Sequence, residues 1–221
     1  MAISPQQTES ENFPVEVDLR DGSRVLIRPV TPDDKHLIEV GLEHLSKESR
    51  YLRFFHPVSK LSRKLLTEFT EIDHIDHEAI GALGTGSNSD MPFGVARYIR
   101  APHHPTVAEI AVTVIDGQQG KGLGTLLLAF LACRAVSNGV TEFCAYVLGG
   151  NHRMLEVFKE LGSTTETGPA GEVEPRQQVV LFQSCRTGCI AGRHGGSPVG
   201  SGDKYRARYF LCLSARVADF R

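Results

Sequence analysis

The sequence predicts an α/β protein in which a mixed sheet carries helices on both faces. Short segments of alternating apolar residues are separated by turn sequences, which is typical of strands. Stretches with helical patterning before and after a glycine-rich turn indicate that helices interrupt the series of strands. With 221 residues and 41% apolar content, the chain can bury one ordinary core without metals or disulfides.

The first third of the chain predicts a β-hairpin followed by helices. Alternating residues on both sides of an Asp-Gly turn predict a hairpin over 15–30. Thr31 then stands where a helix N-cap is expected, with Pro32 at the first helical position. Helical patterning continues, with breaks, to about Thr70.

The remaining part of the chain predicts five strands and two helices. A long apolar stretch predicts a helix over 123–136, and a second helix begins near Asn151 and ends at Gly162, because glycine commonly ends helices. The strands are expected over 79–83, 93–100, 108–115, 142–148 and 177–182.

Residues 118–125 are the most informative segment, because they read Gln-Gln-Gly-Lys-Gly-Leu-Gly-Thr between a predicted strand and a predicted helix. Backbone N–H groups in such a turn, and the positive end of the helix dipole behind it, favour a bound phosphate. Glycines at 120, 122 and 124 let a diphosphate approach the backbone without clashing with Cβ atoms. The segment predicts a pyrophosphate-binding turn, and a tight turn without a ligand is the alternative for this motif alone.

Spacing distinguishes three phosphate-binding motifs. A P-loop requires Ser or Thr after its Gly-Lys pair, whereas Gly122 follows Lys121 here. A dinucleotide-binding fingerprint requires Gly-x-Gly-x-x-Gly, and this chain has Gly-x-Gly-x-Gly. The remaining pattern, Gln-x-x-Gly-x-Gly, is met by Gln119, Gly122 and Gly124. It resembles the pyrophosphate loop of the GNAT superfamily of acyl-CoA-dependent N-acetyltransferases.

The segment after the loop extends this resemblance. Residues 151–162 resemble the GNAT helix Asn-x-x-Ala-x-x-x-Tyr-x-x-x-Gly, whose first turn contacts the pantetheine arm of coenzyme A. Asn151 and Gly162 match this pattern, whereas Met154 and Phe158 replace its alanine and tyrosine. The resemblance implies the GNAT fold, a central mixed, mostly antiparallel sheet flanked by helices.

The segments between the predicted hairpin and the next strand narrow the resemblance. Residues 45–55, 61–62, 65–70 and 72–74 together resemble the substrate side of bacterial Pat-type protein lysine acetyltransferases. This subgroup acetylates a lysine of acyl-CoA synthetases, so the resemblance implies a protein lysine as acceptor. Some members carry a fused nucleotide-binding domain, and none is expected before the first strand, which only 14 residues precede. The apolar residues of this region also have helical spacing, so core packing accounts for them whatever the function.

The resemblance implies acetyl-CoA as co-substrate and no metal. A lysine ammonium, with a pKa of about 10.4, needs a general base before it attacks a thioester. The position of Glu109 resembles that of the general base in Pat-type enzymes, and we expect burial beside Ile110 and Val112, which makes a carboxylate more basic. A strand acid that is exposed or salt-bridged is the alternative. Phe158 cannot donate a proton to the leaving thiolate, which leaves open a weak or inactive enzyme.

The other residue roles are assigned by motif position. Backbone N–H groups around Val112 to Val114 are expected to polarise the thioester carbonyl. Asp73 and His74 are expected to line the lysine-binding side, although histidines flanked by acids are commoner in surface loops. The cofactor-binding residues are expected to be Val112, Val114, Gln119, Gly120, Lys121, Gly122, Leu123, Gly124, Thr125, Asn151, Met154 and Phe158.

Composition favours a soluble, cytoplasmic protein. The first residues lack the basic start and apolar run of a signal peptide, and no stretch approaches the ~20 residues of a membrane span. The five cysteines are expected to be reduced, and a zinc site at Cys185 and Cys189 is not expected because a second ligand pair is missing. No nucleic-acid or membrane partner is expected, and the sequence does not indicate an oligomeric state.

The chain divides into three parts that differ in composition and expected structure. Residues 1–13 are expected to be a flexible N-terminus, 14–182 the acetyltransferase domain, and 183–221 a tail of unknown role. The tail has seven Lys or Arg residues against two Asp, and six glycines, which is typical of a solvated tail and less often of a nucleic-acid contact. An atypical, frame-altered C-terminus is a further alternative.

The sequence therefore predicts an acetyl-CoA-dependent N-acetyltransferase that transfers acetyl to a protein lysine by direct attack in a ternary complex. A small-amine N-acetyltransferase and a catalytically silent acyl-CoA-binding regulator are the alternatives. The first is expected to acetylate polyamines or aminoglycosides rather than proteins, and the second to bind coenzyme A without turnover.

Overall fold

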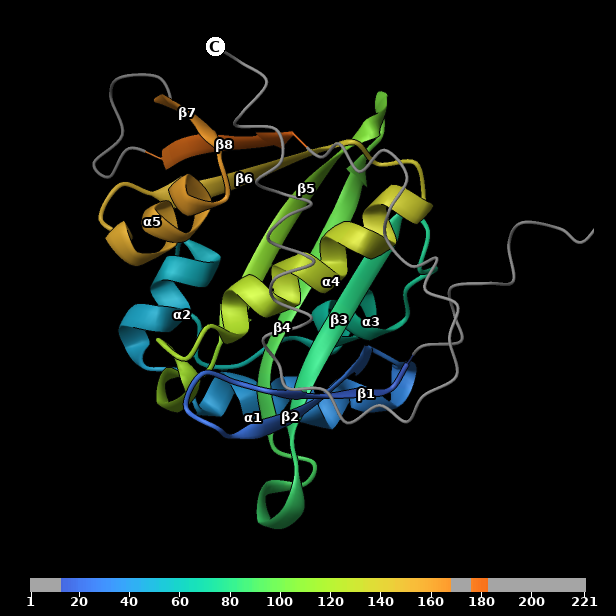
Figure 1. Cartoon of the computed structure of the whole chain (residues 1–221), viewed down its shortest axis with the longest axis vertical. Helices are drawn as coiled ribbons and strands as arrows, with labels where there is room; N and C mark the ends of the chain where they lie inside the picture. The colour runs from blue at the N-terminus through green and yellow to red at the C-terminus, as the bar shows by residue number, and fades with distance from the viewer. Residues whose placement is uncertain (1–12, 168–175, 183–221) are drawn as a thin grey trace, which may run out of the picture.

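The eight strands that are described form one sheet in the order β1-β2-β3-β4-β5-β6-β8-β7 (Figure 1). The computed structural model describes residues 13–167 and 176–182. Every neighbouring pair of strands is antiparallel except β5 and β6, which are parallel, so the predicted mixed, mostly antiparallel sheet is confirmed. The strands are β1 (Val15–Asp18), β2 (Arg24–Pro29), β3 (His77–Gly84), β4 (Pro92–Ala101), β5 (His104–Val114), β6 (Glu142–Leu148), β7 (Thr164–Thr167) and β8 (Arg176–Phe182).

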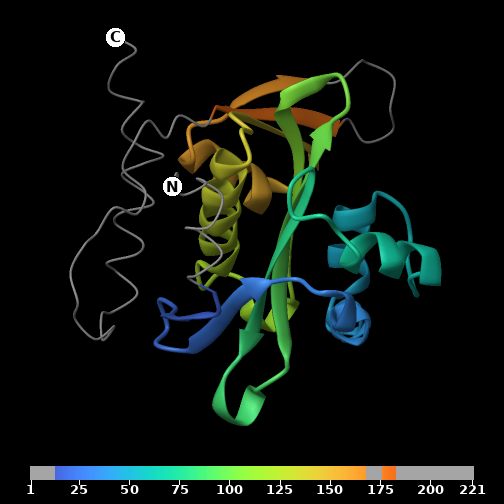
Figure 2. The same ribbon diagram turned by 90° about the vertical axis from the view of Figure 1, so that its right-hand side faces the viewer.

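Helices cover both faces of the sheet, as predicted. Figure 2 shows α4 on one face and α1, α2 and α3 on the other. Short 3-10 turns link several elements: η3 (Pro32–Asp34), η4 (Gly86–Asn88) and η5 (Asp116–Gln118). The α-helices in the described residues are α1 (Lys35–Glu43), α2 (Lys47–Phe54), α3 (Arg63–Thr70), α4 (Leu123–Ser137) and α5 (His152–Glu160).

The main core lies between α4 and the sheet. Leu123, Leu127 and Leu131 of α4 are each at most 1% exposed, and they pack against strand residues such as Ile80 and Tyr98. A helix that is apolar around most of its circumference needs this degree of cover. A smaller cluster of Leu42, Leu45, Leu61 and Leu66 holds the helical layer on the opposite face together.

One difference from the predicted fold lies at the edge of the sheet, and the two ends of the chain are not described. The four-residue strand β7 extends the sheet beyond β8 and was not expected from the sequence. The tail over 183–221 and residues 1–12 of the expected flexible N-terminus lie outside the described residues, as do Cys185 and Cys189. Within the part that is described, no helix has the length and apolar character needed to cross a membrane.

Candidate active site

The sheet opens where β5 and β6 separate. The two strands pair only over 107–109 and 142–144, with Glu109 opposite Cys144 as the last pair. Beyond that pair β5 continues to Val114 and β6 to Leu148, and Figure 1 shows the two ribbons diverging. The edge of β5 over 110–114 that faces β6 therefore has no strand partner among the described residues, which leaves its backbone groups available to a ligand. We call this opening the wedge.

The glycine-rich turn lies directly after the end of β5 and leads into α4, so the predicted strand, turn and helix are all present. Gly120 and Gly122 have φ angles of 79° and 86°, in the left-handed region that favours glycine. Gly122 is the N-cap of α4. Because glycine has no side chain that caps the first turn, the N–H groups of this turn remain available to an anion.

The side chain of Gln119 holds the turn in position. Its Nε2 donates to the backbone oxygen of Val114 at 3.1 Å and to Asp116 Oδ1 at 3.2 Å. Its Oε1 accepts a hydrogen bond from Arg153 Nη1 of α5 at 2.6 Å. Gln119 thus connects the end of β5, the turn and the start of α5, which brings α5 to the wedge.

Lys121 connects the same turn to the β1–β2 hairpin. Its Nζ lies 3.0 Å from Asp21 Oδ2 and donates to Gln118 Oε1 at 2.9 Å. The Ser23 hydroxyl and then Lys121 hold the pKa of the Asp21 carboxyl well below its ordinary value, so this aspartate is charged. Lys121 is therefore already paired in the free protein, and an anion at the turn meets backbone N–H groups first.

The cofactor-binding residues predicted in α4 and α5 divide into surface and core positions. Asn151 caps α5, because its Oδ1 accepts from the Met154 N–H at 3.2 Å. Met154 is half-buried against the main core, while Phe158 is 2% exposed and Leu123 1% exposed within it. Phe158 and Leu123 thus serve packing in this structure and present almost no side-chain surface to a ligand.

The two valines predicted on β5 point towards α4. Val112 and Val114 are half-buried and pack against the main core. Because their side chains pack into the core, the contact of their backbone groups with a thioester stays a prediction. Gly124 and Thr125 are half-buried in the first turn of α4.

Glu109 lies at the apex of the wedge, and its side chain is exposed. The expectation that it is buried is wrong. Side chains alternate along a strand, so Ala108 and Ile110 enter the core beneath α4 while Glu109 points to the face that carries α1, α2 and α3. Its neighbours in register are Ile99, which is 52% exposed, and Cys144. Burial, followed by the charge of Glu109, raises the pKa of the Cys144 thiol, so this cysteine is protonated.

The structure does not bring Asp73 and His74 to Glu109. Asp73 Oδ1 accepts three backbone N–H bonds at 2.9 Å and so shapes the turn before β3. His74 Nδ1 lies 2.7 Å from Oε1 of Glu78, which is fully buried and also bound by Arg134 of α4 at 2.8 Å. These contacts place the His74 side chain with the α4 face of the sheet, opposite the face of Glu109.

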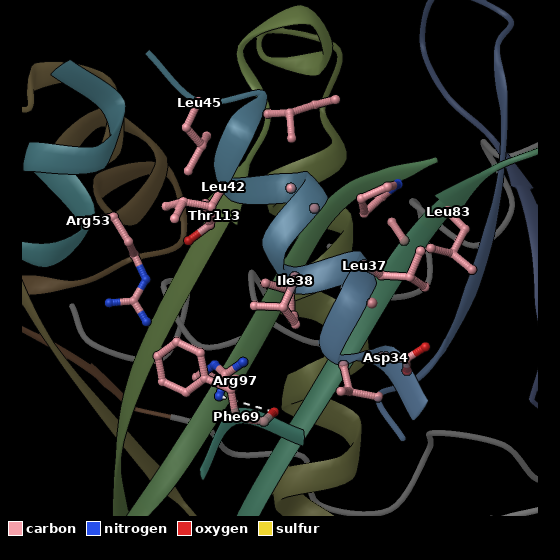
Figure 3. A pocket seen from close by; sticks show the side chains of 18 of the residues that line it. Asp34, Leu37, Ile38, Leu42, Leu45, Arg53, Phe69, Leu83, Arg97 and Thr113 are labelled. Carbon is pink, nitrogen blue, oxygen red and sulfur yellow. Dashed lines mark hydrogen bonds between the residues drawn. The ribbon is translucent and has the colours of Figure 1, made fainter. Parts of the chain in front are cut away.

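A pocket lies between the sheet and the layer of α1, α2 and α3, with a cavity volume of about 90 Å³. Figure 3 shows that Arg53 of α2 and Arg97 of β4 extend into the same end of it. Neither residue was expected at a site from the sequence. The available signal was Arg97 itself, a cation within the alternating apolar segment over 93–99.

Comparison with known proteins identifies the fold family. The family model described as "Acetyltransferase (GNAT) family" matches residues 44–163, which include the wedge, the turn and the start of α5. The chain belongs to the GNAT family of acetyltransferases. The resemblance to the GNAT superfamily that the sequence showed is therefore confirmed.

Two Pat proteins are similar to this GNAT chain. Acetyltransferase Pat of Mycolicibacterium smegmatis is 36% identical over 165 residues, which cover 73% of this chain and 47% of the relative. The chain thus spans about half the length of that relative. The crystal structure of the GNAT domain of S. lividans PAT has a TM-score of 0.67 and 31% identity, and the match covers 76% of this chain and 96% of that domain.

A more distant solved structure shares the fold alone. Spermidine N-acetyltransferase from Vibrio cholerae, in complex with CoA and spermine, has a TM-score of 0.56 and 14% identity, with coverage of 72% and 95%. Among the residues that the structure of this GNAT chain describes, no group of three or more His, Cys, Asp or Glu side chains is placed to hold a metal ion.

His77, next to Arg97 in this GNAT chain, is expected to be neutral at pH 7. Burial, and then the charge of Arg97, lower the pKa of His77 from 6.5 to about 4. Between these pH values the unfolded chain binds more protons than the folded one, so the free energy of unfolding falls as the pH is lowered from 6.5 towards 4. An NMR titration of the imidazole, assigned with His77→Gln, measures this pKa. A midpoint at the ordinary value would contradict the expected burial.

Proposed function

We propose that this GNAT chain is an acetyl-CoA-dependent N-acetyltransferase whose acceptor is a protein lysine. The observation that carries the proposal is the combination of the wedge, the glycine-rich turn at the end of β5, and an exposed carboxylate at the apex. Acetyl-CoA has one chemical part for each of these features. Its extended pantetheine arm suits the wedge, its pyrophosphate suits the glycine-rich turn, and its reactive thioester suits the apex where the carboxylate lies.

The residues fit this co-substrate. The first turn of α4, with glycine as N-cap, supplies N–H donors for the pyrophosphate, and Gln119 and Lys121 keep the turn in shape through their own contacts. The open backbone edge over 110–114 supplies strand-like hydrogen bonds for the amides of pantetheine. Asn151 and Met154 line the start of α5 on the other side of the wedge. Acetyl-CoA supplies the acetyl group as an activated thioester.

Glu109 acts as the general base in this proposal. It is exposed, so an amine arriving from solvent can reach it. Its carboxylate takes up the proton that the lysine ammonium loses, and the neutral amine then attacks the thioester directly in a ternary complex. Backbone N–H groups of 112–114 orient the thioester carbonyl. Phe158 is a buried hydrocarbon, so water protonates the departing thiolate, whose pKa is about 8.5 as a free thiol.

The protein-lysine acceptor is supported by the Pat relatives rather than by the wedge. The match to Acetyltransferase Pat extends over 165 residues, and the match to the S. lividans PAT domain covers 96% of that domain. We infer that an acyl-CoA synthetase lysine is the acceptor, in keeping with the resemblance of 45–74 to Pat-type enzymes. A cytoplasmic location belongs to the same proposal, because both acetyl-CoA and acyl-CoA synthetases occur there.

This proposal is tested by asking which acceptor the protein acetylates. The protein is incubated with acetyl-CoA and either a purified acyl-CoA synthetase or a panel of small amines that includes spermidine, and products are read by mass spectrometry. We expect one acetylated lysine in the synthetase, absent when that lysine is changed to arginine. Acetylated spermidine with an unmodified synthetase would contradict a protein acceptor. Binding of CoA without any product would indicate the silent regulator.

A further inference from the structure

The pocket beneath α1, α2 and α3 has an unbalanced charge. Most of its lining is apolar, from residues such as Leu37, Ile38, Leu42 and Phe54. Its charged lining residues are one aspartate, Asp34, and three arginines, Arg28, Arg53 and Arg97. The lining side chains thus carry two positive charges in excess.

At one end of the pocket the charges are matched. Arg28 binds Asp34 through two hydrogen bonds, from Nη1 to Oδ2 at 2.7 Å and from Nη2 to Oδ1 at 2.6 Å. This is the paired arrangement that a guanidinium and a carboxylate favour. It shows how this pocket accommodates an arginine when the chain itself provides the anion.

At the other end, no carboxylate of the described residues forms an ion pair with Arg97. Its side chain is 4% exposed, and its described hydrogen bonds are long: Nη1 to the Phe69 oxygen at 3.5 Å and to His77 Nε2 at 3.4 Å. The Phe69 ring, 4.0 Å from Cζ, stabilises the cation in part. Burial, and then the charge of Arg53, lower the pKa of Arg97 to about 9, so at pH 7 it is a buried cation whose Nε and Nη2 donors lack a hydrogen-bond partner in the described residues.

Arg53 adds a second cation to the same end. Its side chain is half-buried and extends from α2 towards Arg97, as Figure 3 shows. Burial lowers the pKa of Arg53, and the charge of Glu109 opposes this effect. Among the described residues neither Arg53 nor Arg97 takes part in an ion pair. Two arginines that repel each other across an apolar pocket are a costly arrangement unless an anion joins them.

The pair also lies next to the apex of the wedge. On β4, Arg97 stands two residues before Ile99, which is paired with Glu109, and Arg97 itself is paired with Ala111. Two residues along a strand span about 7 Å, and residues two apart share one face of the sheet. Arg97 and Glu109 are therefore diagonal neighbours on one face of the sheet, so an anion between the arginines lies beside the place where acetyl transfer is proposed.

We propose that Arg53 and Arg97 bind the carboxylate of a small substrate at the active site. The proposal rests on the proposed acetyltransferase function and adds a substrate class to it. A guanidinium pair matches the planar carboxylate, and the apolar lining suits a short hydrocarbon chain. The carboxylate has two sources that the test distinguishes. It is either the distal end of a dicarboxylic acyl group such as succinyl, which keeps the protein lysine as acceptor, or part of a small amine acceptor such as glutamate, which would take the place of that lysine.

The test compares ligands with and without a carboxylate. Binding of acetyl-CoA, succinyl-CoA and glutamate is measured by calorimetry for the wild type, Arg97→Met and Arg53→Gln. Arg63→Gln, which removes an exposed arginine of α3 outside the pocket, is the control. We expect both pocket variants to lose about 10-fold or more in affinity for succinyl-CoA or glutamate, and less than about 2-fold for acetyl-CoA.

The two sources give different results. A loss of affinity confined to succinyl-CoA assigns Arg53 and Arg97 to the acyl group. A loss of affinity confined to glutamate assigns them to a small amine acceptor and contradicts the protein-lysine acceptor, while acetyl-CoA dependence still holds. Equal affinity of wild type and both variants for both ligands would overturn the inference while leaving the acetyltransferase proposal intact. Failure of the wild type to bind acetyl-CoA would instead refute the proposed function.

A ligand-free measurement separates this role from a structural one. If Arg97 is an unpaired buried cation, Arg97→Met removes a charge and keeps the chain length, so the melting temperature without ligand is expected to stay the same or rise. A clear fall in melting temperature for Arg97→Met, together with unchanged ligand affinity in Arg53→Gln, would mean that the arginines support the fold instead.

Discussion

Glu109→Gln is expected to lower kcat for acetyl transfer by about 100- to 10,000-fold, the usual contribution of a general base. The substitution keeps the size of the side chain and removes its ability to take up a proton. Because Glu109 is exposed at the apex of the wedge, the fold does not depend on its charge. Steady-state rates and the dissociation constant for acetyl-CoA, measured on the same preparation, test this expectation.

The control for this variant is Glu68→Gln in α3, which alters an exposed acid away from the wedge. It is expected to leave kcat unchanged. A Glu109→Gln enzyme that retains most of its activity would show that another group, or water alone, accepts the proton. A large fall in acetyl-CoA affinity would instead show that Glu109 acts in binding.

Gly122→Val is expected to weaken acetyl-CoA binding by about 100-fold or more. Gly122 has a φ of 86°, which a β-branched residue rarely adopts, and its substitution displaces the N–H groups that open α4. Several charge-assisted hydrogen bonds to the pyrophosphate are lost together, and each contributes about 1.5–3 kcal/mol. Calorimetric titration with CoA measures the effect.

Gly117→Ala is the matched control, since Gly117 lies in the preceding 3-10 turn and a Cβ there meets nothing within 4 Å. It is expected to change the affinity by less than about 3-fold. Wild-type affinity in Gly122→Val would contradict the assignment of the turn as the pyrophosphate site. Equal melting temperatures of the two variants exclude unfolding as the cause.

Features with a local physical cause were predicted well from the sequence. The hairpin over 15–30, the strand-turn-helix around Gly122 and the helix that starts near Asn151 and ends at Gly162 follow from turn residues, glycines and apolar periodicity, which depend on near neighbours. The strand β7 was missed, because four residues rich in Thr carry no apolar alternation.

Features that depend on distant contacts were predicted poorly. The sequence places Glu109 on a strand, but the side of the sheet it faces depends on α4, which packs against its neighbours Ala108 and Ile110. His74 was expected near the acceptor and instead binds the buried Glu78. Arg53 and Arg97 come from segments far apart in the chain, so only the folded structure shows that they line the same end of one pocket.

Acetyl transfer to a protein acceptor that depends on Glu109 is best measured as release of free thiol from acetyl-CoA in the presence of a purified acyl-CoA synthetase. Wild type and Glu109→Gln are compared side by side. We expect thiol release that rises with synthetase concentration for the wild type and is reduced at least about 100-fold in the variant. Release that is independent of the acceptor, or equal for the two proteins, would contradict this expectation.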